Sequence, residues 1–198
     1  MKRTIGVMGS SGGDFDDATL AAAYEVGRQI AKHDCVLVTG ACPGLPLQAA
    51  RGAKAEGGLV VGISPGLSAD EHMYKYGSPL QYHDVTIYTG SGLMGREIAN
   101  IRSSDIVIIL GGRSGTLGEF AIAYDEGKLI GILQGSGGIA DLAPQIVESL
   151  HKDTGAHIVY QADPAQLVEA TLDMFDFTHH RRPSCFHRPP RTLVESWD

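Results

Sequence analysis

Short runs of apolar residues alternate with longer stretches of helical periodicity along most of the chain. The runs are almost continuously apolar, as expected for strands of a sheet that is covered on both faces. The stretches between them place apolar residues three or four positions apart, which is typical of amphipathic helices. The expected strands are residues 4–8, 35–38, 59–63, 85–88, 105–110, 129–133 and 157–160. The expected helices are residues 16–32, 45–56, 93–103, 116–125, 140–152 and 164–175.

This alternation of strands and helices predicts right-handed crossovers and a parallel sheet. We therefore expect a single α/β domain over residues 1–178, a doubly wound, Rossmann-like fold with about seven strands. In such folds a ligand binds beyond the carboxyl ends of the strands, where the strand order reverses. The functional residues should follow the expected strands.

Two segments break the alternation. Residues 64–84 form a polar stretch that is longer than an ordinary connection, so we expect a functional loop or lid with His72 and His83 in solvent. Residues 179–198 hold four arginines and three prolines without periodicity, and we expect an extended or disordered tail. The tail's histidines and Cys185 do not match a metal-ligand spacing, and no metal site is predicted.

Glycine is the unusual feature of the composition, with 26 glycines among 198 residues. Average proteins contain about 7% glycine. The glycines gather after the expected strands and have no collagen-like period. Since glycine lets the backbone approach a ligand closely, this placement indicates a binding site at one edge of the sheet.

Charge, cysteine content and hydropathy argue against several classes of protein. The net charge of −7 argues against a nucleic-acid partner. The three cysteines are odd in number and lie far apart, which favours a reducing cytoplasm over a disulfide framework. No run approaches the ~20 apolar residues of a membrane span, and no signal peptide is expected.

The segment 105–120 has the clearest chemical pattern. A buried strand ends at Gly111-Gly112, and Arg113-Ser114-Gly115-Thr116 opens a helix. Amide groups and the dipole at such a helix start bind phosphate. Thr116 and Glu119 also have the spacing of a capping box, in which they would serve only to cap the helix. The missing lysine excludes a Walker A loop, and the loop after the first strand lacks the dinucleotide fingerprint.

Four segments together resemble one known family. Gly111-Gly112-x-x-Gly115-Thr116-x-x-Glu119 resembles the signature of the LONELY GUY family, and Met94-Gly95-Arg96 falls where that family has its arginine. Residues 39–45 and 62–66 resemble its glycine turns after the second and third strands. The resemblance covers roughly residues 4–175. The wider superfamily includes molybdenum-cofactor carrier proteins and the Rossmann domain of DNA-processing protein A.

This resemblance implies a function and a site. The implied activity is hydrolysis of the N-glycosidic bond of a nucleoside 5′-monophosphate, with Glu119 stabilising the oxocarbenium-like transition state and Arg96 contacting phosphate, ribose or base. The residues expected to bind phosphate or nucleotide are Gly9, Ser10, Gly40, Gly44, Gly111, Gly112, Ser114, Gly115 and Thr116. The resemblance also implies a homodimer or larger homo-oligomer, and no cofactor is expected.

The chain departs from the hydrolase branch at two positions. Glu97 takes the place of a lysine, and Leu110 precedes Gly111 where that branch has a proline. These differences make the chain more similar to the branch near the molybdenum-cofactor carriers. The alternative is therefore a non-catalytic carrier or sensor of a phosphorylated pterin or a nucleotide. A DNA-processing role is disfavoured by the acidic domain.

Overall fold

The computed structural model describes residues 1–179, and the expected tail after residue 179 lies outside the described residues. Its seven strands form one parallel sheet in the order β4-β3-β2-β1-β5-β6-β7. The strands are β1 (Thr4–Gly9), β2 (Val36–Thr39), β3 (Val60–Ser64), β4 (Val85–Tyr88), β5 (Ile106–Leu110), β6 (Leu129–Leu133) and β7 (His157–Gln161). The predicted Rossmann-like fold is confirmed, and each strand lies within one residue of its predicted limits.

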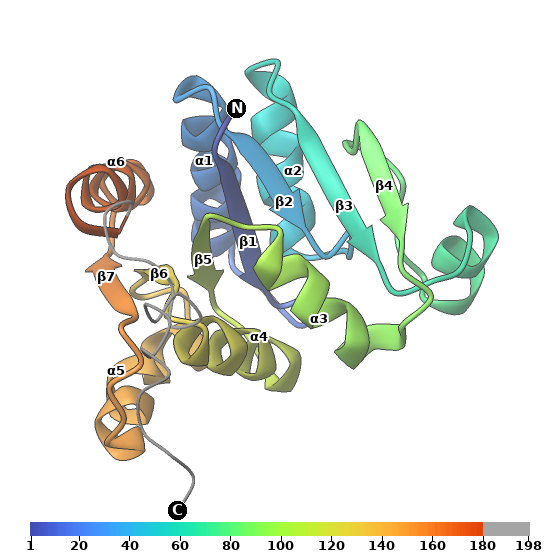
Figure 1. Cartoon of the computed structure of the whole chain (residues 1–198). Helices are drawn as coiled ribbons and strands as arrows, with labels where there is room; N and C mark the ends of the chain where they lie inside the picture. The colour runs from blue at the N-terminus through green and yellow to red at the C-terminus, as the bar shows by residue number, and fades with distance from the viewer. Residues whose placement is uncertain (180–198) are drawn as a thin grey trace, which may run out of the picture.

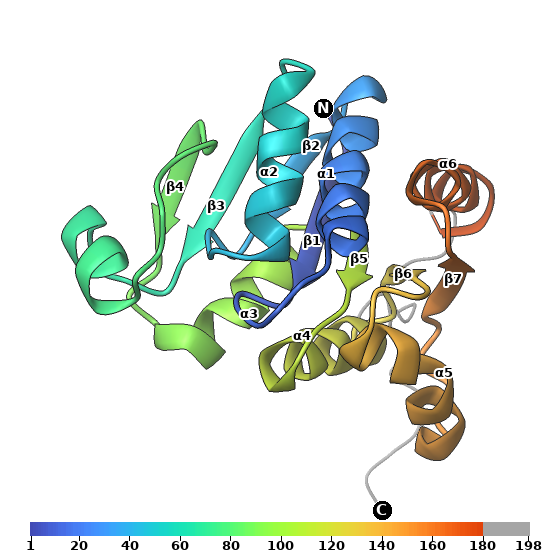
Figure 2. The same ribbon diagram turned by 180° about the vertical axis from the view of Figure 1, so that it is seen from behind.

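Helices cover both faces of the sheet (Figures 1 and 2). They are α1 (Asp17–Lys32), α2 (Leu45–Ala55), α3 (Gly92–Arg102), α4 (Ser114–Asp125), α5 (Gly138–Leu150) and α6 (Pro164–Met174), with π-helical turns η1 (Glu71–Lys75) and η2 (Phe175–His179). Helices α1, α2 and α6 pack on one face, and α3, α4 and α5 pack on the other. None of the described helices is both long and apolar enough to cross a membrane.

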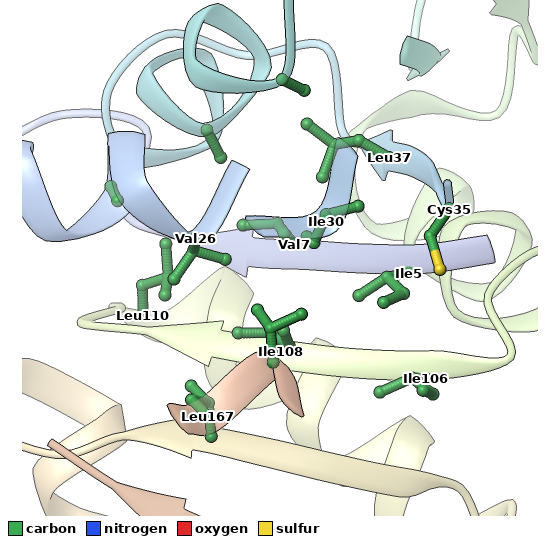
Figure 3. Close-up of a cluster of buried hydrophobic side chains, with 14 of the residues drawn as sticks. Ile5, Val7, Val26, Ile30, Cys35, Leu37, Ile106, Ile108, Leu110 and Leu167 are labelled. Carbon is green, nitrogen blue, oxygen red and sulfur yellow. The ribbon is translucent and has the colours of Figure 1, made fainter. Parts of the chain in front are cut away.

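The core is divided in two by the alternation of side chains along the central strands. On β5, Ile106, Ile108 and Leu110 face α1 and α6, whereas Val107 and Ile109 face the opposite layer. Figure 3 shows the first of these clusters, in which side chains of β1 and β5 meet those of α1. The central strands are therefore buried on both sides, which explains their almost continuous apolar sequence.

The order of the strands reverses between β1 and β5. The chain runs outward from β1 to β4, crosses back to β5 beside β1, and then runs outward in the other direction to β7. The loops that leave β1 and β5 therefore diverge toward opposite faces, and a crevice opens between them.

The long segment between β3 and β4 is anchored to the end of β3 through a buried histidine. His72 in η1 is 0% exposed. Its Nε2 donates to the carbonyl of Pro79 at 3.3 Å, and its Nδ1 accepts from the Ser64 hydroxyl at 2.8 Å. The prediction of two solvated histidines was wrong, because His83 is also half-buried and lies 3.0 Å from the Thr39 hydroxyl.

Candidate functional site

A cavity of about 370 Å³ opens at the carboxyl ends of β1 and β5. Its walls come from the turn after β1, the turn after β2, helix α3 and the first two turns of α4. The residues that line it are Val7, Met8, Gly9, Ser10, Ser11, Gly40, Cys42, Pro46, Leu93, Met94, Arg96, Glu97, Arg113, Ser114, Gly115, Thr116 and Glu119. The position agrees with that of a ligand site at the switch point of a parallel sheet.

Eight of the eleven predicted site residues line this cavity, and three do not. The three that do not line it are Gly44, Gly111 and Gly112. The amide of Gly111 donates to the Ser136 hydroxyl at 2.8 Å, and the amide of Gly112 donates to the Ser10 hydroxyl at 3.0 Å. These two amides are thus used within the protein, and the glycines position the loop.

The backbone conformation explains why residues 111 and 112 are glycines. Their φ angles are 54° and 109°, in the left-handed region that side chains disfavour. A Cβ at Gly112 would lie 2.5 Å from Thr116 Cγ2. This turn brings the chain from β5 directly into α4, so the start of the helix faces the cavity.

The start of α4 supplies hydrogen-bond donors to the cavity. The first helical hydrogen bond runs from the amide of Leu117 to the carbonyl of Arg113 at 2.9 Å. The amides of Ser114, Gly115 and Thr116 therefore extend from the end of the helix, where an anion is favoured. Arg113, which is not among the residues predicted from the sequence to bind phosphate, lines the same end of the cavity.

The capping-box interpretation of Thr116 and Glu119 is wrong. Helix α4 starts at Ser114, two residues before the expected start, and Thr116 lies inside its first turn. Glu119 does not return to the backbone. Its Oε1 accepts from Asn100 Nδ2 at 3.3 Å and lies 3.6 Å from Arg96 Nη1.

Arg96, Asn100 and Glu119 form a buried polar cluster at the floor of the cavity. Arg96 and Asn100 are four residues apart on α3 and so share a face of that helix. Arg96 is 9% exposed and Glu119 is 6% exposed. Within the described residues, Arg96 Nε and Nη1 and Asn100 Oδ1 lack a hydrogen-bond partner. Buried donors and acceptors are rarely left unpaired, so these groups indicate a place for a ligand or ordered water.

Burial dominates the electrostatics of the two cavity carboxyls. It raises the pKa of Glu119 to about 7, against the favourable charge of Arg96 and together with the unfavourable charge of Glu97. Burial also raises the pKa of Glu97, which Arg96 again opposes. Glu119 therefore exchanges a proton near neutral pH, as a group that takes part in acid–base chemistry would.

Cys42 lies in the wall of the cavity beside Arg96. Burial raises the pKa of its thiol despite the positive charge of Arg96. A thiol with a raised pKa is protonated at neutral pH and is a weak nucleophile. Cys42 is therefore a small packing residue of the cavity wall and not an activated nucleophile.

The fold and the cavity at its switch point define a Rossmann-like protein with a ligand-sized cavity at the β1–β5 crevice. Comparison with known families places it more closely. The model of the SLOG cluster4 family matches residues 2–168, and the chain belongs to this family. The predicted membership of the superfamily of LONELY GUY proteins and molybdenum-cofactor carriers is confirmed.

Individual relatives agree with this assignment. An uncharacterized protein of Archaeoglobus fulgidus is 38% identical over 130 residues, which are 66% of this chain and 79% of the relative. The molybdenum cofactor carrier protein of Chlamydomonas reinhardtii is 31% identical with a TM-score of 0.73, covering 88% of this chain and 99% of that one. The molybdenum cofactor binding protein of Rippkaea orientalis is 30% identical with a TM-score of 0.72, covering 88% and 98%.

Proposed function

We propose that the protein binds a small phosphorylated heterocyclic compound, either a pterin phosphate such as the molybdenum cofactor or a nucleoside monophosphate, and holds it without turnover. The observation that supports this most is the cavity itself, which presents the amides of α4 and two arginines at the switch point. Similarity to two proteins named for the molybdenum cofactor, over nearly their whole length, favours the carrier role.

The two ends of the cavity suit two parts of such a ligand. The phosphate fits the start of α4, where the amides of residues 114–116 and the Arg113 guanidinium supply donors and positive charge. The Ser10 and Ser11 hydroxyls lie on the same wall. The heterocycle then extends over Met8 and toward Arg96, whose unpartnered nitrogens offer further donors.

A second candidate function is hydrolysis of a nucleoside 5′-monophosphate to a free base and ribose 5-phosphate. It is favoured by Glu119, a buried carboxyl in the cavity whose pKa is raised to about 7 and which faces Arg96. In this reaction the Glu119 carboxylate would stabilise positive charge on the ribose or orient the attacking water. Arg96 would hold the phosphate or polarise the leaving base.

One experiment separates the two functions. Purified protein is titrated with AMP, GMP and a phosphorylated pterin by calorimetry, and the same mixtures are analysed for released base. A carrier binds at least one of these compounds and releases no base, whereas a hydrolase releases base at a rate that Glu119→Gln abolishes. Absence of binding by all of them would overturn the proposal.

The phosphate end is tested by a pair of arginine variants. Arg113→Ala should weaken binding of the phosphorylated ligand about tenfold or more, because it removes a charge-assisted hydrogen bond. Arg51→Ala is the matched control, because Arg51 is exposed on α2 and lies over the Tyr24 ring outside the cavity. Equal effects of the two variants would contradict the assignment of Arg113.

We also propose that the protein is a homodimer or larger homo-oligomer in the cytoplasm. Helix α3 exposes Leu93, Met94 and Ile98, and α4 beside it exposes Leu117. Exposed apolar side chains on neighbouring helices are typical of surfaces that another chain covers. Since Leu93 and Met94 also line the cavity, a second copy on this surface would narrow its mouth.

A further inference from the structure

Glu97 is a buried carboxylate that nothing in the described part of the chain holds by a hydrogen bond. It lies on α3 directly after Arg96, lines the cavity and is only 4% exposed. No described group donates a hydrogen bond to it. The charged groups that interact electrostatically with it are Arg96 and Glu119. The Glu97 oxygens are absent from the fully buried, unpaired atoms of the described residues, so they remain accessible from the cavity. A largely buried carboxylate that no protein group stabilises is unfavourable for folding, and a ligand that donates hydrogen bonds to it would offset this cost.

The neighbouring helix leaves space for this carboxylate. A Cβ at Gly118 would lie 2.7 Å from Glu97 Oε2, and a Cβ at Gly115 would lie 3.5 Å from Oε1. The two glycines are three residues apart and so share a face of α4. The Glu97 carboxylate thus lies against the side of α4, whereas the free amides of that helix extend from its end.

The charge of Glu97 decides which part of a ligand can lie beside it. A phosphate would be repelled, so it belongs at the end of α4 beside Arg113. A carboxylate accepts two parallel hydrogen bonds from a planar group that carries two adjacent N–H donors. The 2-amino-4-oxopyrimidine ring has such an edge, formed by a ring N–H and the amino group, and both guanine and pterin contain this ring.

We propose that Glu97 is a specificity-determining residue that accepts two hydrogen bonds from the amino and ring N–H groups of a 2-amino-4-oxopyrimidine. This inference rests on the proposed binding of a phosphorylated heterocycle. It adds that adenine and hypoxanthine are poor ligands, because neither offers both donors. It also gives the lysine-to-glutamate difference at position 97 a role, since a lysine would repel the same edge.

The test compares ligands that differ by one amino group. GMP is paired with IMP, and a phosphorylated pterin is paired with the corresponding lumazine, which has a carbonyl in place of the 2-amino group. Calorimetry should show that wild-type protein binds the amino-bearing member of at least one pair about 10- to 100-fold more tightly, the range for hydrogen bonds to a charged group. The pair that shows this preference identifies which ring the site binds, guanine or pterin.

Variants then assign the preference to Glu97. Glu97→Gln keeps the shape of the side chain but replaces one acceptor by a donor, and it should abolish the preference without weakening the amino-free ligand. Gly118→Ala should do the same without changing any charge, because its methyl group displaces the Glu97 carboxylate. Glu126→Gln, which alters a buried glutamate at the other end of α4, should keep the preference.

Three outcomes would overturn the inference, and they are distinguishable from one another. Equal binding of both members of each pair, or an equal loss for both in Glu97→Gln, would leave the proposed function intact and remove the role of Glu97. Failure of wild-type protein to bind any of the four compounds would remove the proposed function and this inference together.

Discussion

At the scale of single residues, glycines create the space that the charged side chains of the cavity occupy. A Cβ at Gly40 would lie 1.7 Å from Arg96 Nη1. Any residue other than glycine at position 40 would therefore clash with the Arg96 guanidinium where it now lies. Gly118 has the same relation to Glu97. The high glycine content therefore has two causes in this site, the left-handed turn before α4 and room for charged groups.

The replacement Gly40→Ala should displace Arg96 from the floor of the cavity. We expect the affinity for the phosphorylated ligand to fall about tenfold or more, with a loss of stability of about 1–3 kcal/mol from overpacking. Calorimetry and urea unfolding measure the two effects. Gly12→Ala is the matched control, since a Cβ there would lie 3.5 Å from Arg113 Nη2, an ordinary contact. Unchanged affinity in Gly40→Ala would contradict the placement of Arg96.

Glu119 makes the stability of the protein depend on pH. Its pKa is raised from 4.5 to about 7 by burial, so the folded chain binds more protons than the unfolded chain between these values. Stability from this group is therefore present below about pH 4.5 and is lost as the pH rises through about 7. The raised pKa of Glu97 acts in the same direction.

Glu119→Gln should remove the contribution of this group, because glutamine resembles the protonated carboxyl. Relative to wild type, we expect little difference near pH 5 and a gain on the order of 1–3 kcal/mol at pH 8. Urea unfolding of both proteins at several pH values measures the difference. The lowered pKa of His83 has the opposite effect on stability, but it is present in both proteins and cancels. A difference that does not change with pH would contradict the prediction.

At the scale of elements, the contact between helices α1 and α2 depends on two more glycines. A Cβ at Gly27 of α1 would lie 1.8 Å from the carbonyl oxygen of Ala49, and a Cβ at Gly52 of α2 would lie 1.9 Å from that of Tyr24. The atoms in the way belong to the backbone, so the helices themselves would have to move apart. Helices α1 and α2 pack against β1 and β2 on the face of the sheet opposite to α3 and α4.

Gly27→Ala should therefore destabilise the protein by about 1–3 kcal/mol despite the better helix propensity of alanine. Urea unfolding measures the change. The reverse exchange at an exposed position of the same helix, Ala21→Gly, should cost only about 1 kcal/mol through propensity. A stabilised Gly27→Ala variant would show that α1 and α2 separate easily.

The sequence predicted the elements well and the site less completely. Buried parallel strands such as β5 have a continuous apolar run that ends in glycine, so their limits could be predicted. The start of α4 was placed too late because the left-handed turn at Gly111-Gly112 begins the helix earlier than any capping residue indicates. Glu97 and Arg113 were not selected because their roles depend on the packing of α3 against α4, which no local pattern describes.

At the scale of the whole molecule, the proposed oligomer gives a prediction about the exposed face of α3. Ile98 is 43% exposed there, and Ile98→Asp should shift the protein toward the monomer because it introduces a charge into an apolar contact. Light scattering coupled to gel filtration measures the mass. Leu142→Asp on α5 is the control, because Leu142 is 52% exposed on another helix and should leave the mass unchanged. A wild-type protein that is monomeric would contradict the proposed oligomer.

The central position of β1 has a consequence for how the protein is made. β1 (Thr4–Gly9) leaves the ribosome well before its neighbour β5, which begins only at Ile106. While the residues between these two strands are synthesised, the nascent chain has an open edge on β1, which is a hazard for aggregation. The ligand cannot assist folding in this period, because the cavity needs both strands and α4. A nascent chain stalled before β5 is thus the form of this protein that should need a chaperone most.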